Sequence, residues 1–339
     1  MPAEWARHAS TWLTWPTNRT TWPGKLLAEV EGIYLDMLGA LLPGEKVNLL
    51  VPDRRIAEKV LSTLACRRVG TGRLVLHPVR AVDTWIRDYG PIFVRRPDGS
   101  KAFTKWTFNA WGGKYRDLAR DNGVVDRLDA LRSVRRFDAG LVMEGGSLDV
   151  DGRGTCLTTE QCLLNPNRNP ALNRTDLERW LRAYLGAEKV IWLKEGIEGD
   201  DTDGHVDDIT RFVGASTVVT AVEPDRSDPN HAPLEENRRI LAGERDARGR
   251  RLRVVELPMP GHVRLRRDRG RLPASYANFY IGNAAVLAPV YSHSNDRKAL
   301  KILRRLFPGR RVVGIECTAL VYGLGSIHCV TQQEPAKQI

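Results

Sequence analysis

The sequence predicts a mixed α/β fold made of five similar units, and two observations support the prediction. Helix-like and strand-like segments alternate along the chain, and a short hairpin recurs after several of the strands. One polar residue marks a loop in each unit, and the marked residues are 56, 61, 73 and 51 positions apart. Repeats of this size are typical of radial or stacked architectures, and a radial one gathers equivalent loops at a common axis. The marked residues are Asp88, Glu144, His205, Asn278 and Cys329.

Helices are expected where apolar residues recur at helical spacing, as Ile56, Val60 and Leu64 do after Pro52. Short apolar runs between the helices predict strands. The helices are expected at residues 25–42, 53–66, 175–185, 234–248 and 296–307. The strands are expected at residues 47–51, 74–76, 190–193, 254–257 and 312–315.

Four tight turns are expected to join pairs of short strands, because each has a turn-forming residue pair between two apolar runs. The first two are Asp98-Gly99, between strands 92–95 and 102–108, and Asp151-Gly152, between strands 148–150 and 155–158. The other two are Gly214-Ala215, between strands 209–213 and 218–221, and Gly282-Asn283, between strands 279–281 and 285–287.

The composition is that of a globular protein, with 339 residues of which 42% are hydrophobic and 27% charged. No Gly/Ser or Pro-rich tract divides the chain, so one domain is expected over residues 1–339. The first residues form neither a basic nor an apolar leader segment, and no stretch reaches membrane-spanning length. We therefore expect a cytoplasmic protein without a membrane partner.

Five cysteines without a CxxC pair argue against a disulfide framework and a structural zinc site, and favour at least one free thiol. The net charge of +11 raises the alternative of a nucleic-acid-binding protein. That alternative is distant, because the basic residues are dispersed and no nucleic-acid-binding module is present. The densest basic run, residues 264–271, is interpreted as a solvated loop.

Cys329 follows a glycine-rich approach in the segment YGLGSIHCVTQQ, residues 322–333. Glycines allow the backbone to come close to a ligand, which suits a reactive thiol at a binding site. The alternative is a buried, inert cysteine in a terminal strand, and the cysteine alone does not decide between the two.

Residues 195–208 hold seven acids among fourteen residues, around a single histidine, His205. Such a cluster in a basic protein calls for a compensating cation. Calcium is one candidate, but the twelve-residue calcium loop with its final Glu is absent. An organic cation would balance the same negative charge. A solvated acidic loop without any bound cation is the alternative to both.

Two further segments place carboxylates beside turns. In WIRDYGP, residues 85–91, Trp85 could stack on a planar cation and Asp88 could accept paired hydrogen bonds from a guanidinium. In MEGGS, residues 143–147, Glu144 lies on a Gly-Gly corner. Taken alone, each segment is explained as readily by a structural role as by a functional one.

Together these segments resemble the family of agmatine deiminases and bacterial-type peptidylarginine deiminases over nearly the whole chain. The resemblance implies the pentein fold, a five-bladed α/β propeller of ββαβ-type units with pseudo-fivefold symmetry. It is carried by Glu4-Trp5 and by residues 12–16 (WLTWP), 85–91 (WIRDYGP), 108–115 (FNAWGGKY), 144–147 (EGGS), 165–170 (NPNRNP), 201–207 (DTDGHVD) and 327–333 (IHCVTQQ).

The same resemblance implies a role for each matching residue. Cys329 would be the nucleophile and His205 the general acid and base. Asp88 and Asp207 would hold the guanidinium nitrogens, and Glu144 would lie beside His205. Trp85 and Asp201 match positions that contact the substrate's tail. One departure is the loop before the nucleophile, which reads GLGS at residues 323–326 where the family usually has GGGN.

The resulting hypothesis is hydrolysis of agmatine to N-carbamoylputrescine and ammonia through a covalent amidino intermediate on Cys329, which would belong to putrescine and polyamine biosynthesis. No metal or organic cofactor is expected. Agmatine is preferred because its amine needs distant negative charge, which Asp200, Asp201 and Asp203 could supply. Peptidylarginine or free arginine is the alternative substrate. The partner expected is a small cationic guanidino compound rather than nucleic acid, and self-association stays open.

Overall fold

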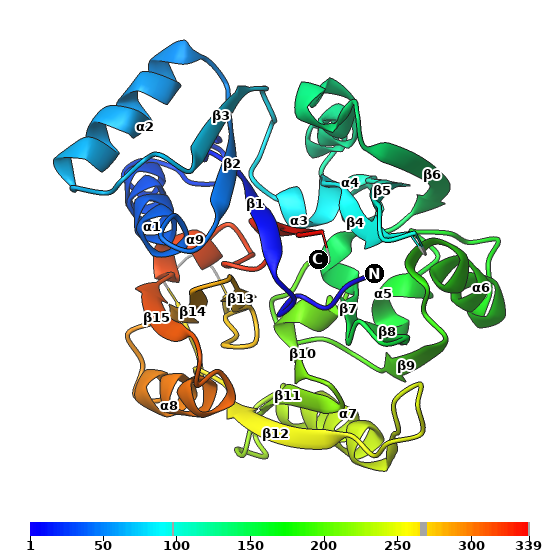
Figure 1. Ribbon diagram of the computed structural model, residues 1–339. Helices are drawn as coiled ribbons and strands as arrows, with labels where there is room; N and C mark the ends of the chain where they lie inside the picture. Colours follow the sequence, from blue (N-terminus) through cyan, green and yellow to red (C-terminus); the bar gives the residue numbers. More distant parts are fainter. Residues whose placement is uncertain (97, 265–269, 338–339) are drawn as a thin grey trace.

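The computed structural model of the protein describes residues 1–96, 98–264 and 270–337. Five small sheets surround a common axis, with the longer helices on the outside and the first and last described residues near the centre of the view (Figure 1). The five-bladed α/β propeller that the family resemblance implies is therefore confirmed, and so are the five units expected from the repeated loops. In the described part of the chain no helix combines the length and the apolar character needed to cross a membrane.

Blades 2 to 5 have the same connectivity. An antiparallel pair of strands comes first, and a crossover then leads to a third strand, parallel to the second. Blade 2 contains β4 (Ile92–Arg95), β5 (Lys101–Thr107) and β6 (Arg135–Val142), and blade 3 contains β7 (Asp149–Val150), β8 (Thr155–Thr159) and β9 (Lys189–Leu193). Blade 4 contains β10 (Thr210–Gly214), β11 (Thr217–Val222) and β12 (Arg253–Pro258), and blade 5 contains β13 (Tyr280–Ile281), β14 (Ala285–Val290) and β15 (Arg311–Glu316).

Blade 1 joins the two ends of the sequence. Its order is β16 (Thr331–Pro335), β1 (His8–Thr14), β2 (Lys46–Val51) and β3 (Leu74–Pro78). β16 lies antiparallel to β1, with Trp12 opposite Gln332, and the Trp12 indole donates to Glu334 Oε2 at 2.8 Å. The strand pair that completes the ring thus comes from opposite ends of the chain, and neither strand was predicted.

Two of the crossover helices, α2 (Arg54–Cys66) and α6 (Arg174–Leu185), combine an apolar stripe with a side-chain cap. In α2 the Asp53 side chain accepts from Ile56 N at 2.9 Å, and the stripe of Ile56, Val60 and Leu64 is buried. The other long helices are α1 (Leu26–Leu41), α7 (His231–Gly243) and α8 (Asp296–Leu306), and the short ones are α3 (Ile86–Tyr89), α4 (Ala110–Gly113), α5 (Glu160–Leu163) and α9 (Thr318–Val321).

One predicted helix and one predicted turn were placed wrongly. The helix expected at 234–248 is α7, His231–Gly243; it starts earlier because Pro233 is tolerated in a first turn. It ends earlier because the Asp246 carboxylate accepts from the backbone of residues 248 and 250, which forms a turn instead. The β10–β11 turn is Ala215-Ser216 rather than Gly214-Ala215, since Gly214 pairs with Thr217.

The basic run at 264–271 lies mostly outside the described residues, but its last member is described. Arg271 is buried, and its guanidinium contacts Asp228 at 2.6 Å and Glu198 at 3.4 Å. The interpretation of this residue as part of a solvated loop was therefore wrong. An arginine run in sequence does not reveal which member finds acidic partners on distant loops.

All five marked polar residues lie where one blade leads into the next. Each follows the last strand of a blade and precedes the first strand of its successor, so the five loops converge near the axis, on one side of the ring. Their order is Asp88, Glu144, His205, Asn278 and Cys329.

Candidate active site

A cavity of about 590 Å³ opens among these loops. Its wall includes the predicted site residues Trp85, Asp88, Asp201 and Cys329. His205, Asp207 and Glu144 are also predicted site residues, but they are buried behind the cavity wall. The remaining lining residues are Asn18, Thr20, Thr21, Val82, Trp111, Tyr115, Arg116, Asp117, Leu118, Arg120, Thr202, Tyr322, Gly323, Leu324 and Gly325.

Cys329 lies at the inner end of this cavity and is 6% exposed. The Asn278 amide Nδ2 donates to its Sγ at 3.2 Å. Burial, followed by the charges of Asp207, Asp208 and Asp88, raises the pKa of the Cys329 thiol well above its usual value. This shift favours the protonated thiol, and a cation bound against these carboxylates would oppose their effect.

The glycine-rich approach to Cys329 is required by packing. A Cβ on Gly325 would come within 2.5 Å of the Trp85 ring and 3.2 Å of Cys329 Cβ. The predicted close approach therefore exists, but in this structure the closest atoms belong to the aromatic wall of the site. Leu324 has a φ of 72°, a conformation that favours glycine, at the position where the sequence departs from the family's usual loop.

Asp88 is held by neutral donors. Its Oδ2 accepts from Trp111 Nε1 at 2.9 Å and its Oδ1 from Gly146 N at 2.9 Å. Burial, with the charges of Asp207 and Glu144, raises the pKa of the Asp88 carboxyl well above its usual value. A buried carboxylate with only neutral partners leaves room for a cationic ligand.

The loop that supplies Trp111 is strained. Ala110 and Trp111 have φ values of 58° and 55°, in the left-handed region, which costs about 1–2 kcal/mol per non-glycine residue. Gly112 continues the turn, and a Cβ there would lie 2.3 Å from the Asn167 side chain. This backbone conformation aims the Trp111 indole at Asp88.

The His328 imidazole holds one carboxylate oxygen of Asp207 in place. His328 Nδ1 lies 2.6 Å from Asp207 Oδ2, and His328 Nε2 lies 2.8 Å from Glu4 Oε2. Burial opposes ionisation of Asp207, but the hydrogen bond and charge of His328 lower its pKa below the usual value. Its other oxygen, Oδ1, has no hydrogen-bond partner within the described chain. Asp207 therefore presents an ionised oxygen to the site.

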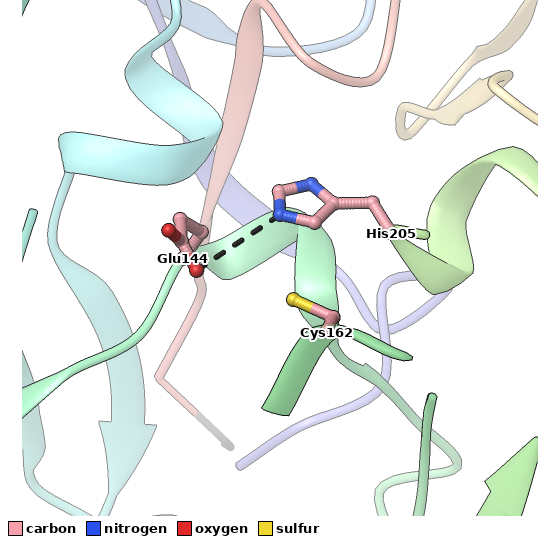
Figure 2. Close-up of side chains that lie close together, drawn as sticks. All are labelled: Glu144, Cys162 and His205. Atoms are coloured by element: carbon pink, nitrogen blue, oxygen red, sulfur yellow. Dashed lines mark ion pairs between the residues drawn. The ribbon is translucent and has the colours of Figure 1, made fainter. Parts of the chain in front are cut away.

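His205 lies between two carboxylates without a hydrogen bond to either. Its Nδ1 is 3.8 Å from Asp88 Oδ1, and its Nε2 is 4.0 Å from Glu144 Oε2 (Figure 2). Burial lowers the pKa of His205 to about 3, so the ring is neutral at physiological pH. Neither ring nitrogen has a hydrogen-bond partner among residues 1–96, 98–264 and 270–337.

Glu144 is positioned by Arg168, whose Nε donates to Glu144 Oε1 at 2.7 Å. The Arg168 guanidinium also contacts Asp203 Oδ2 at 2.7 Å, so two acids share its charge. Burial raises the pKa of Glu144, and Arg168 opposes the shift. The second oxygen, Oε2, is buried without a partner in the part of the chain that the structure describes.

The acids of the 195–208 loop do not act together, contrary to expectation. Asp200 is used internally, since its carboxylate accepts from the backbone of Thr202 and Gly204 at 2.8 and 2.9 Å. Asp203 is paired with Lys114 at 2.7 Å as well as with Arg168. Only Asp201 reaches the cavity, where the Tyr115 hydroxyl donates to it. Donors and basic side chains of the protein itself therefore balance much of the negative charge of residues 195–208.

Sequence reasoning missed several residues of the site. Asn278 was marked as a loop residue, but its contact with Cys329 was not anticipated. Arg168, Trp111 and His328 occur within the segments that carried the family resemblance, so those segments were the available signal. Their partners lie 24, 23 and 121 positions away, which local patterns do not reveal.

Among the residues that the structure describes, two groups of side chains could hold a metal ion. Within each group the donor atoms lie within 4.8 Å of one another, and all of the residues are buried. One group is Asp207, Asp208 and Cys329, and the other is Glu144, Cys162 and His205.

The blade topology and the shared loop face define a five-bladed α/β propeller of the pentein class. An amidinotransferase of Microseira wollei has the same fold, with a TM-score of 0.54 at 10% identity over 100% of this chain and 98% of that one. An agmatine deiminase of Enterococcus faecalis is much more similar, with a TM-score of 0.91 at 33% identity over 100% and 96% of the two chains.

The family model of the Porphyromonas-type peptidyl-arginine deiminases matches residues 1–335, and the chain belongs to this family. In sequence the chain is 38% identical to the agmatine deiminase of Stutzerimonas stutzeri, over 99% of this chain and 95% of that protein. A further structure is of a C. jejuni agmatine deiminase with a cysteine-to-serine substitution and substrate bound. It gives a TM-score of 0.87 at 30% identity over 99% and 96% of the chains.

Proposed function

We propose that this protein is an agmatine deiminase, a hydrolase that converts agmatine and water to N-carbamoylputrescine and ammonia. The observation that carries the proposal is the pair of buried carboxylates beside Cys329. Asp88 has only neutral hydrogen-bond donors, and Asp207 keeps one oxygen unpartnered within the described chain. A planar guanidinium is the organic cation that such carboxylates bind through paired hydrogen bonds.

Cys329 would act as the nucleophile once this cation is bound. The positive charge offsets the carboxylates that raise the thiol pKa, so substrate binding itself favours the thiolate. The thiol proton passes to neutral His205, and the sulfur attacks the central guanidinium carbon. His205 then gives the proton to one nitrogen, the carbon–nitrogen bond breaks, and ammonia leaves.

The amidino group now on Cys329 is a thiouronium cation. Neutral His205 takes a proton from water, and the resulting hydroxide attacks the same carbon. The carbon–sulfur bond breaks, the ureido product leaves, and the thiolate recovers a proton. Glu144 would hold the imidazole in place during both steps, because it faces Nε2 and is itself anchored by Arg168.

The substrate's tail would lie along the outer part of the cavity. Trp85 lines the wall next to Cys329, and Asp201 offers a carboxylate farther along the cavity. Agmatine ends in a primary ammonium group, which Asp201 could bind. Asp200 and Asp203 are withdrawn from this role, because they are committed to backbone and basic partners inside the protein.

A second candidate substrate is free or peptidyl arginine, and one observation favours it. Arg116 and Arg120 line the same cavity, and Arg116 is exposed there. A guanidinium at this position could pair with the carboxylate of free arginine, which agmatine lacks. The deciding assay measures ureido product from agmatine, free arginine and a blocked arginine peptide in parallel. Agmatine is expected to give the highest kcat/KM, and a preference for either arginine substrate would overturn the assignment.

The remaining parts of the proposal concern the whole protein. Residues 1–339 would form one catalytic domain, without metal or organic cofactor and without a nucleic-acid partner. Its place would be the cytoplasm, where its product would feed putrescine and polyamine biosynthesis. Self-association into a homo-oligomer would be compatible with this function.

A further inference from the structure

Cys162 lies close to the imidazole of His205, on the short helix α5 of blade 3. Its thiol is fully buried and points toward His205 and Glu144 (Figure 2). The sulfur, a ring nitrogen and a carboxylate oxygen lie within 4.8 Å of one another. The catalytic steps proposed above do not use Cys162, so its position among these groups calls for another explanation.

Two of the three donors are unsatisfied as well as close. Glu144 Oε2 and His205 Nε2 are both buried and lack hydrogen-bond partners within the described residues. The two residues are 0% and 1% exposed. Two neighbouring blades contribute, since Glu144 precedes β7 and Cys162 follows β8 in blade 3, and His205 precedes β10 of blade 4. The propeller therefore brings together polar atoms that have no protein partner.

The donor types are those that bind zinc. Thiolate, imidazole and carboxylate are its usual protein ligands, at about 2.0–2.3 Å, whereas magnesium and calcium prefer oxygen alone. A tetrahedral ion with these bonds sets its ligands roughly 3.3–3.7 Å apart. Glu144 Oε2 and His205 Nε2 are 4.0 Å apart, and all three donor atoms lie within 4.8 Å of one another, so zinc binding requires them to draw together by about 1 Å. Arg168 does not exclude a cation, because Asp203 shares its charge.

We propose that Cys162, His205 and Glu144 form an inhibitory zinc site. The ion would bind Cys162 Sγ, His205 Nε2 and Glu144 Oε2, with water in the fourth position and the thiol proton released to solvent. Zinc bound in this way holds the imidazole that the deiminase reaction needs for proton transfer. The inhibition rests on the proposed function, whereas the binding of zinc does not.

The binding test uses the full-length protein, freed of metal by EDTA and dialysis, with a chromophoric zinc chelator as competitor. Cys329→Ser is the reference protein, because it removes the sulfur of the other candidate group, Asp207, Asp208 and Cys329. One zinc ion per chain is expected. Adding Cys162→Ser should weaken binding at least about 100-fold, since even residues that only support a metal ligand are worth about 10- to 100-fold. Adding Cys156→Ser, which alters another buried cysteine, should leave the affinity unchanged.

The inhibition test measures agmatine hydrolysis. Stoichiometric zinc should inhibit the wild type, EDTA should restore activity, and equal concentrations of magnesium or calcium should have no effect. Cys162→Ser should keep its basal rate and lose the sensitivity to zinc. A Cys162→Ser protein that zinc inhibits as strongly as the wild type would overturn the proposal, because the ion would then act through Cys329.

The absorption spectrum of the cobalt-bound protein identifies the metal ligands directly, so this test does not depend on whether the Cys162→Ser variant folds. Cobalt bound to a thiolate gives a strong near-ultraviolet charge-transfer absorption, and the Cys329→Ser protein should show it. Absence of that band, or zinc binding that Cys162→Ser does not weaken, would exclude the site even if the protein hydrolyses agmatine. Failure to hydrolyse agmatine would instead refute the proposed function and leave both binding measurements valid.

Discussion

Asn278 donates a hydrogen bond from Nδ2 to Cys329 Sγ over 3.2 Å, and the same amide group donates to Asp208 Oδ1 at 2.9 Å. Its Oδ1 accepts from His328 N at 2.8 Å. One buried amide thus fixes both the backbone before the thiol and the thiol itself. Asn278 is a positioning residue for Cys329, with the chemistry to stabilise a thiolate.

Replacing Asn278 by Asp should therefore slow the reaction more than it weakens binding. The change removes a donor and adds a negative charge beside the sulfur, so the pKa of Cys329 should rise further. A hydrogen bond to a charged group contributes about 1.5–3 kcal/mol, so kcat should fall by roughly 10- to 100-fold. The rising limb of the kcat profile should move to higher pH. Asn237→Asp, a change at another buried Asn, is the control, and an equal loss of kcat there would contradict the assignment.

Cys329→Ser is expected to abolish turnover and to leave the thermal unfolding temperature nearly unchanged. An alcohol is a far weaker nucleophile than a thiolate in the same position. Cys317→Ser provides a matched change at a buried cysteine away from the cavity. Retention of even a tenth of wild-type activity by pure Cys329→Ser would disprove covalent catalysis by this residue.

Asp201→Asn should separate agmatine from substrates without an amine. The change keeps size and hydrogen bonding but removes the charge, so kcat/KM for agmatine should fall by roughly 10- to 100-fold. A neutral-tailed alkylguanidine should be nearly indifferent to it. Asp117→Asn, at an exposed acid on the same cavity wall, should cost little for either substrate. Equal losses for both substrates with Asp201→Asn would mean that this residue supports the loop instead.

The low pKa of His205 predicts a pH dependence of stability. The folded state holds His205 neutral down to about pH 3, whereas the unfolded chain protonates it near the usual histidine pKa of 6.5. The unfolded state therefore binds the extra proton between these values, and stability is lost as pH falls through this window. Relative to His205→Gln, the wild type should lose about 2 kcal/mol of unfolding free energy between pH 7.5 and pH 5. Both free energies are measured by urea unfolding. If the difference in unfolding free energy between the two proteins is the same at pH 7.5 and at pH 5, the lowered pKa of His205 is refuted.

Treatment with EDTA is expected to leave agmatine hydrolysis undiminished, because a thiol, an imidazole and carboxylates suffice for the proposed steps. If zinc contaminates the preparation, the chelator should raise the rate. A rate that EDTA lowers and that calcium or zinc restores would mean that a metal takes part in the reaction.

Much of the architecture was predictable because its signals are local. The repeated turn pairs and apolar runs identified the hairpins and crossovers, and Asp53 and the Ile56, Val60 and Leu64 stripe placed α2. The spacing of the five loop residues indicated the number of blades. The strands β1 and β16 were missed, because the pairing of Trp12 with Gln332 depends on a contact 320 positions away.

The sequence alone determined the types of chemical groups available: one cysteine after a glycine-rich loop, one histidine among acids, and carboxylates beside turns. The tertiary structure decided which of them act. It paired Asp203 with Lys114 and Arg168 and left Asp201 at the cavity. The physical reason is that the charge of a carboxylate is set by burial and by partners within a few ångströms. Those partners come from different blades, so only closure of the propeller brings them together.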